Sequence, residues 1–131
     1  MKKIKKTARA ILNALDFPDG ELSILIVDDQ QIANLNRTFL NRKGPTNVIA
    51  FPMREGPFGE ITPNLLGDVV ISIETAKHEA DAARISLQNR FNQLLIHGIL
   101  HLLGYDHERI PAEAERMEQK SISLLAMLDG N

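Results

Sequence analysis

The stretch from Leu87 to Leu103 constrains the fold more than any other part of the chain. It reads LQNRFNQLLIHGILHLL, and its apolar residues lie on nearly every side of a helix. Such a helix is stable only where other elements cover most of its surface. Ser86, a residue type favoured at helix N-caps, precedes it. We therefore predict a buried helix over residues 87 to 103 at the centre of the fold.

This predicted helix carries the first two histidines of an HxxxHxxGxxH pattern. His97 and His101 are four residues apart, so one helical face presents both imidazoles to a single point. Gly104 stands where a helix ending in a left-handed residue needs glycine, and the turn directs His107 towards that point. Three neutral imidazoles on a tetrahedral metal leave a fourth position open, as in catalytic zinc sites. We predict that His97, His101 and His107 bind one metal ion.

The alternative is that these histidines only satisfy hydrogen bonds in the core. Three of the chain's four histidines fall within eleven residues at ligand spacing, which favours the metal site. The fourth, His78, lies in the polar run ETAKHEADAAR and is predicted to be a solvated helix residue. Zinc suits three imidazoles, although nickel and other divalent metals also bind such sites.

The histidine spacing is also that of the metzincin proteases, in which a glutamate directly follows the first histidine and acts as general base. Gly98 occupies that position here. Since glycine cannot accept a proton from water, a metallopeptidase would need a base from elsewhere in the chain. A metallopeptidase therefore remains only as an alternative function.

Three motifs together resemble the YbeY family of bacterial metal-dependent endoribonucleases. They are PTNVIAFP at 45 to 52, LLGDVVIS at 65 to 72 and HGILHLLGYDH at 97 to 107, in the family's order. The resemblance runs from about Glu21 to the end of the chain. It implies a cytoplasmic, zinc-dependent, single-strand-specific endoribonuclease acting in 16S rRNA 3′ end processing and ribosome quality control. Its partners would be single-stranded RNA, rRNA, and the ribosome or ribosomal proteins.

Two acidic residues are candidates for roles beside the metal. Asp68 matches the family's LGD and is predicted to act as a catalytic base or to support a metal ligand. Its alternative role is to cap backbone groups at the strand end. Asp106 is predicted to accept a hydrogen bond from a ligand imidazole, or else only to stabilise the turn before His107.

Four basic residues are candidates for phosphate contacts. The family commonly places an arginine after the aromatic residue of the helix before PTNVIAFP, but here Leu40 follows Phe39. Arg37 and Arg42 are predicted to substitute for that catalytic arginine, and Lys43 and Arg54 to bind substrate. Leu40 also gives weight to a further alternative, a ribosome-associated binding factor with a structural metal.

Length and composition are consistent with this reading. The chain has 131 residues, enough for one domain with a single core, and we expect residues 1–131 to form one metal-dependent hydrolase domain. It has no cysteine, so neither a disulfide nor a thiolate metal site can form, which is compatible with a reducing cytosol. No stretch is long enough to span a membrane, and the basic, apolar start is predicted to be an amphipathic helix rather than a signal peptide.

Charge is distributed unevenly along the chain. The net charge is −2, which is not typical of an indiscriminate nucleic-acid binder. Nine Lys and Arg stand against five acids in residues 1 to 54, and six against twelve in residues 55 to 131. If the substrate is RNA, its phosphates are expected along the N-terminal half. Otherwise the imbalance is an ordinary solvated surface.

The predicted fold class is α+β, a small mixed sheet packed against several helices. The strand over Glu21 to Val27 is apolar on both sides of its alternation, so it is predicted to be central and covered on both faces. The helix that ends at Leu40 is predicted to turn Phe39 and Leu40 inward. The family has an additional strand before its first helix, so we expect a sheet one strand smaller. The other expected elements are strands at 46 to 51 and 67 to 73, and helices at 30 to 40, 74 to 84 and from Pro111 until Gly130.

Overall fold

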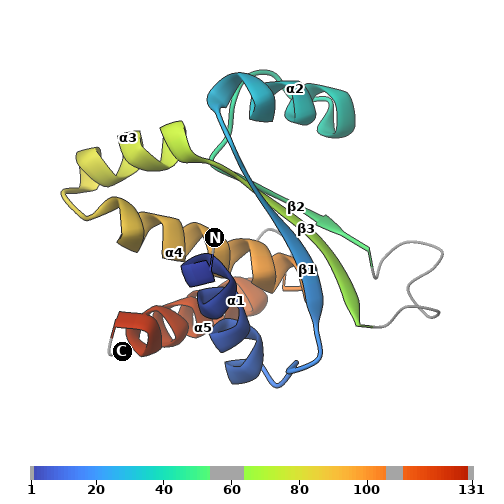
Figure 1. Ribbon diagram of the computed structural model, residues 1–131, viewed down its shortest axis with the longest axis vertical. Coiled ribbons are helices and arrows are strands. Elements are labelled where there is room, and N and C mark those ends of the chain that lie inside the picture. Colours follow the sequence, from blue (N-terminus) through green and yellow to red (C-terminus); the bar gives the residue numbers. More distant parts are fainter. Residues whose placement is uncertain (1, 54–63, 106–110, 130–131) are drawn as a thin grey trace.

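The computed structural model describes residues 2–53, 64–105 and 111–129. Helices and a small mixed sheet alternate in it, which confirms the α+β class (Figure 1). None of the described helices is both long and apolar enough to cross a membrane. In chain order the elements are α1 (Lys2–Ala14), β1 (Glu21–Val27), α2 (Asp29–Leu40), β2 (Val48–Pro52), β3 (Leu65–Ser72), α3 (Ile73–Ala83), α4 (Leu87–Leu102) and α5 (Pro111–Asp129).

The described sheet has three strands in the order β1-β3-β2. β3 is the central strand, parallel to β1 and antiparallel to β2. The prediction of a central β1 was wrong, because β1 lies at an edge with Leu25 43% and Ile26 39% exposed. The apolar pattern correctly predicted a strand, but α2 covers this edge only in part. Val27 packs against the cluster around Ile32, whereas Leu25, on the same face of β1, is exposed.

Alternate residues of β3 serve two separate apolar clusters. Val69 and Ile71 pack with α1, α4 and α5 in the larger cluster. Val70, on the other face, packs with Ile32 of α2 and Ile49 of β2. Thus α4 and α2 lie on opposite faces of the sheet (Figure 1).

Helix α4 is the most buried helix in the described part of the chain, as predicted. The side-chain oxygen of its N-cap, Ser86, accepts a hydrogen bond from Asn89 N at 3.0 Å. Burial extends around the helix and includes one polar residue, Asn92. The buried residues are Phe91, Asn92, Leu94, Leu95, Ile96, Gly98, Ile99, Leu100 and Leu102.

Helix α2 begins where the sequence predicts but does not pack as predicted at its end. Asp28 and Gln31 form a capping box, in which each side chain accepts a hydrogen bond from the other's backbone N–H. The inward placement of Phe39 and Leu40 was wrong, since they are 65% and 41% exposed. Phe39 and Phe51 form an edge-to-face pair with ring centroids 5.7 Å apart, and most of the Phe39 side chain remains in solvent.

A hydrogen-bonded joint ties the start of α2 to the start of α3. Asp29 Oδ1 accepts hydrogen bonds from Ser72 Oγ, at the end of β3, and from Thr75 Oγ1. The bond from Ser72, followed by that from Thr75, lowers the pKa of the Asp29 carboxyl below its ordinary value. Ser72 is also the N-cap of α3, so this joint fixes the direction in which α3 leaves the sheet.

Candidate metal centre

His97 and His101 converge as their spacing predicts. Their Nε2 atoms are 3.1 Å apart, and their ring centroids 4.6 Å apart with 66° between the planes. Two nitrogens about 2.1 Å from a tetrahedral zinc ion are separated by roughly 3.3 Å, so the pair fits two ligands of one metal. Both rings are half-buried on α4, whose other faces are held in the core.

The chain turns sharply after His101. Gly104 has a φ of 96°, the positive value predicted for it, and its N–H donates to His101 O at 3.0 Å. Tyr105 N–H donates to Leu100 O at 3.0 Å, which closes the turn. His107 and Asp106 lie outside the described residues, and among those described no three His, Cys, Asp or Glu form a metal-binding group. The binding of one metal by all three histidines stays a prediction.

Gly98 lets α4 approach the sheet closely. A Cβ at this position would lie 2.6 Å from Val69 Cγ1 and 3.4 Å from Val48 Cγ2. Residue 98 therefore faces the sheet, away from solvent, and a glutamate side chain has no room there. The general base of the metzincin mechanism is excluded by packing as well as by the identity of the residue.

Replacing Gly98 with alanine is expected to destabilise the fold. The clash with Val69 is an overpacking that costs about 1–3 kcal/mol, against a helix-propensity gain of about 1 kcal/mol. The net loss should appear as a lower urea midpoint with an unchanged slope. Val69→Ala, which removes the clashing methyls, should be less costly in the Gly98→Ala background than alone. Strictly additive effects of the two substitutions would contradict the close contact.

Asp68 is not placed with the histidines. It pairs with Ser23 of β1 and Phe51 of β2. By strand alternation it shares the face of Val70, whereas α4 packs on the face of Val69. The structure therefore gives no support to Asp68 as a base beside the metal.

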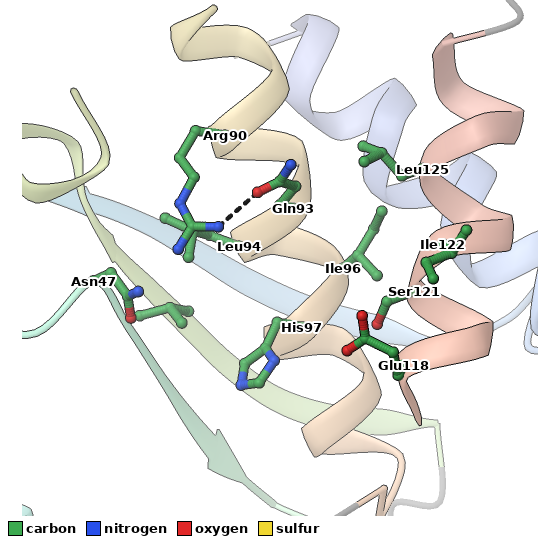
Figure 2. A pocket seen from close by; sticks show the side chains of 11 residues that line it. Asn47, Arg90, Gln93, Leu94, Ile96, His97, Glu118, Ser121, Ile122 and Leu125 are labelled. Atoms are coloured by element: carbon green, nitrogen blue, oxygen red, sulfur yellow. Dashed lines mark hydrogen bonds between the residues drawn. The ribbon is translucent and has the colours of Figure 1, made fainter. Parts of the chain in front are cut away.

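A pocket that the sequence analysis did not predict opens beside His97 (Figure 2). Its volume is ≈ 410 Å³, and it lies between the start of β2, α4 and α5. A signal was present, because Arg90, Gln93, His97 and His101 recur at helical spacing as a polar stripe on an otherwise apolar helix. The lining residues are Asn47, Val48, Arg90, Gln93, Leu94, Ile96, His97, Glu118, Ser121, Ile122 and Leu125.

Comparison with known proteins assigns the chain to a family. A profile described as Endoribonuclease YbeY matches residues 1–129. The chain belongs to the Endoribonuclease YbeY family. Curated relatives with that name include one from Geobacter sulfurreducens, 49% identical over 98% of this chain and 86% of its own length. Another, from Aquifex aeolicus, is 43% identical over 96% of this chain and 82% of its own length.

A solved structure resembles the fold of this YbeY family member. The solution structure of TM1509 from Thermotoga maritima superposes with a TM-score of 0.68 over 95% of this chain and 77% of that one. Sequence identity between the two is 23%, so this likeness concerns the fold alone.

The basic residues predicted to contact phosphates lie mostly on and after α2. Arg37 is exposed on the last turn of α2, and Arg42 and Lys43 are exposed in the loop that follows it. Since α2 covers the sheet face opposite α4, the structure does not bring Arg37 to the face of the histidines. Leu40, which follows Phe39, is the last residue of α2. Arg54 lies outside the described residues.

Proposed function

We propose that the protein is a metal-dependent endoribonuclease that hydrolyses single-stranded RNA. The observation that carries this proposal is the convergence of His97 and His101 on a buried helix, in a chain whose relatives are named endoribonucleases. The proposed metal is zinc, one ion per chain held by His97, His101 and His107, with nickel or another divalent metal as the alternative.

Two physical properties of the site support this chemistry. When bound, a divalent metal polarises a phosphoryl oxygen and lowers the pKa of water from about 16 towards about 7. The imidazoles that would hold it stand on α4, which is fixed between the sheet and α5, so their positions are set by the core. Asp68 has no part in this proposal because it lies on the opposite sheet face.

The substrate is proposed from the family and from charge. We assign ribosomal RNA, with 16S rRNA 3′ end processing and ribosome quality control as the roles and the cytoplasm as the location. Arg37, Arg42 and Lys43 are exposed and would attract the phosphates of a strand that extends beyond the histidines. Their contribution would weaken as salt concentration rises.

One experiment tests the proposed activity. Purified protein, either loaded with zinc or treated with chelator, is incubated with a single-stranded fragment of the 16S rRNA 3′ end, its duplex form and a general peptide substrate. Cleavage of the single strand alone, only by the zinc-loaded protein, is expected. Cleavage that persists in chelator would contradict metal dependence, and cleavage of the peptide alone would establish a metallopeptidase instead.

Leu40 favours one second candidate, a ribosome-associated binding factor whose metal is structural. An exposed leucine in place of the family's arginine removes a charge that could stabilise the transition state. Stable metal and RNA binding without cleavage of any RNA would support this second candidate.

A further inference from the structure

The pocket beside His97 combines an apolar floor with a polar rim. Leu94 and Ile96 of α4 and Leu125 of α5 form apolar walls, while Asn47, Arg90 and Gln93 lie to one side and Glu118 to the other (Figure 2). Polar and apolar surfaces meet in this pocket, so it suits a small organic group that carries both kinds of surface.

One carboxylate, that of Glu79, links the polar residues of the rim. Arg90 Nε donates to Glu79 Oε1 at 3.0 Å, and Arg90 Nη2 lies 2.9 Å from the same oxygen. Asn47 Nδ2 donates to both carboxylate oxygens of Glu79, at 3.2 and 3.3 Å. Arg90 Nη1 also donates to Gln93 Oε1 at 2.6 Å. These contacts connect Asn47, which precedes β2, with Glu79 of α3 and with Arg90 and Gln93 of α4, beside the proposed metal centre.

Hydrogen-bonding capacity remains on this rim. A guanidinium has five N–H groups, and the contacts of Arg90 with Glu79 and Gln93 engage three of them. Asn47 Oδ1 accepts no hydrogen bond from the described residues. Gln93 Nε2 donates one of its two N–H groups to Asn89 Oδ1. The rim thus offers both donors and an acceptor in fixed positions.

We propose that this pocket binds the base of the nucleotide next to the cleaved phosphate. This inference rests on the proposed ribonuclease function, since it places a phosphate at the histidines and its base beside His97. The pocket suits a base better than a phosphate, because Glu79 neutralises Arg90 and Glu118 adds negative charge. A flat, heteroaromatic base would use both the apolar walls and the donors and acceptor of the rim.

A bulky residue at Ser121 tests this assignment. Ser121 is half-buried and lines the pocket, whereas Ser123, two residues on in α5, is exposed and does not line it. Ser121→Phe should fill the pocket and weaken the binding of single-stranded RNA to chelator-treated protein about tenfold or more. Ser123→Phe should bind RNA as the parent does. Unchanged zinc content and unfolding midpoint in both variants would show that the metal centre and fold are intact.

A second measurement separates this inference from the proposed function. Nucleoside monophosphates are titrated into the isotope-labelled, metal-free protein, and the side-chain amide signals of Asn47 and Gln93 are followed by NMR. Shifts in these signals that Ser121→Phe abolishes would support the base pocket even in a protein that cleaves no RNA. RNA cleavage with an unchanged KM in Ser121→Phe, or monophosphate binding that leaves both amides unshifted, would overturn it.

Discussion

Replacing His101 with alanine is expected to remove zinc binding and RNA cleavage together. The substitution leaves His97 without the imidazole whose Nε2 lies 3.1 Å from its own. A metal centre with three protein ligands loses most of its affinity when one ligand is removed. Cleavage should therefore fall by about a thousandfold or more, roughly 4 kcal/mol of transition-state stabilisation. Metal content by mass spectrometry and cleavage of a single-stranded rRNA fragment measure the two effects on one preparation.

His78 supplies the matched control for this substitution. It is an exposed histidine on α3, and His78→Ala removes an imidazole without altering the pair on α4. That variant should retain zinc and parental activity. Circular dichroism of His101→Ala should match the parent, since the side chain is only half-buried. A His101→Ala protein that lacks zinc but cleaves RNA at the parental rate would rule out the metal mechanism.

Replacing Gly67 with alanine is expected to cause the largest loss of stability of any substitution considered. Gly67 has a φ of 137°, and a Cβ there would lie 2.1 Å from Phe51 O and 3.0 Å from Met53 N. Both atoms belong to the backbone of β2 or the residue after it, so neither can move without opening the β2–β3 pairing. Backbone strain of about 1–3 kcal/mol and this clash together should lower the free energy of unfolding by about 4 kcal/mol or more.

Gly44 allows the clash to be measured apart from the backbone strain. It also has a positive φ, 83°, but a Cβ there would meet no atom within 4 Å. Gly44→Ala should therefore cost only about 1–2 kcal/mol. Urea unfolding of both variants gives the steric contribution as their difference. Equal losses in the two variants would mean that β2 does not pass as close to Gly67 as the structure shows.

The part of the fold that could be predicted from sequence is the part governed by local pattern. Apolar periodicity identified α4 as the buried helix, and the caps Asp28 and Ser86 follow from residue type next to that periodicity. Histidine spacing alone was enough to bring His97 and His101 together, because an α-helix fixes the relation of residues four apart.

The errors concern relations between elements. An apolar strand pattern does not say how far a neighbouring helix extends, so β1 was predicted to be covered where Leu25 is exposed. The sequence also does not show which sheet face Asp68 lies on. The register of β1 against β3 shifts between Glu21 and Leu22, near the start of β3. Such an irregularity can change which face each later side chain occupies, so alternation along the sequence alone does not place Asp68.

The pocket could not be predicted from the sequence because the residues of its rim are far apart in the chain. Asn47 and Glu79 are separated by 32 residues, and their contact depends on how the strand β2 and the helix α3 are placed relative to each other. The polar stripe on α4 was visible as a pattern, but Glu118, which lines the same pocket, comes from α5. Such a constellation depends on tertiary contacts that no local periodicity encodes.

The close contact of Gly98 in α4 with the sheet has a consequence for metal binding. Gly98 has no side chain, so the backbone of α4 packs directly against the Val69 side chain of β3. This close packing fixes the position of α4 relative to the sheet. The two imidazoles are thus brought together during folding, before any ion arrives. An ion that binds there has little ordering entropy to overcome. Because it would bind the folded arrangement of α4 and not the unfolded chain, it would also raise the free energy of unfolding.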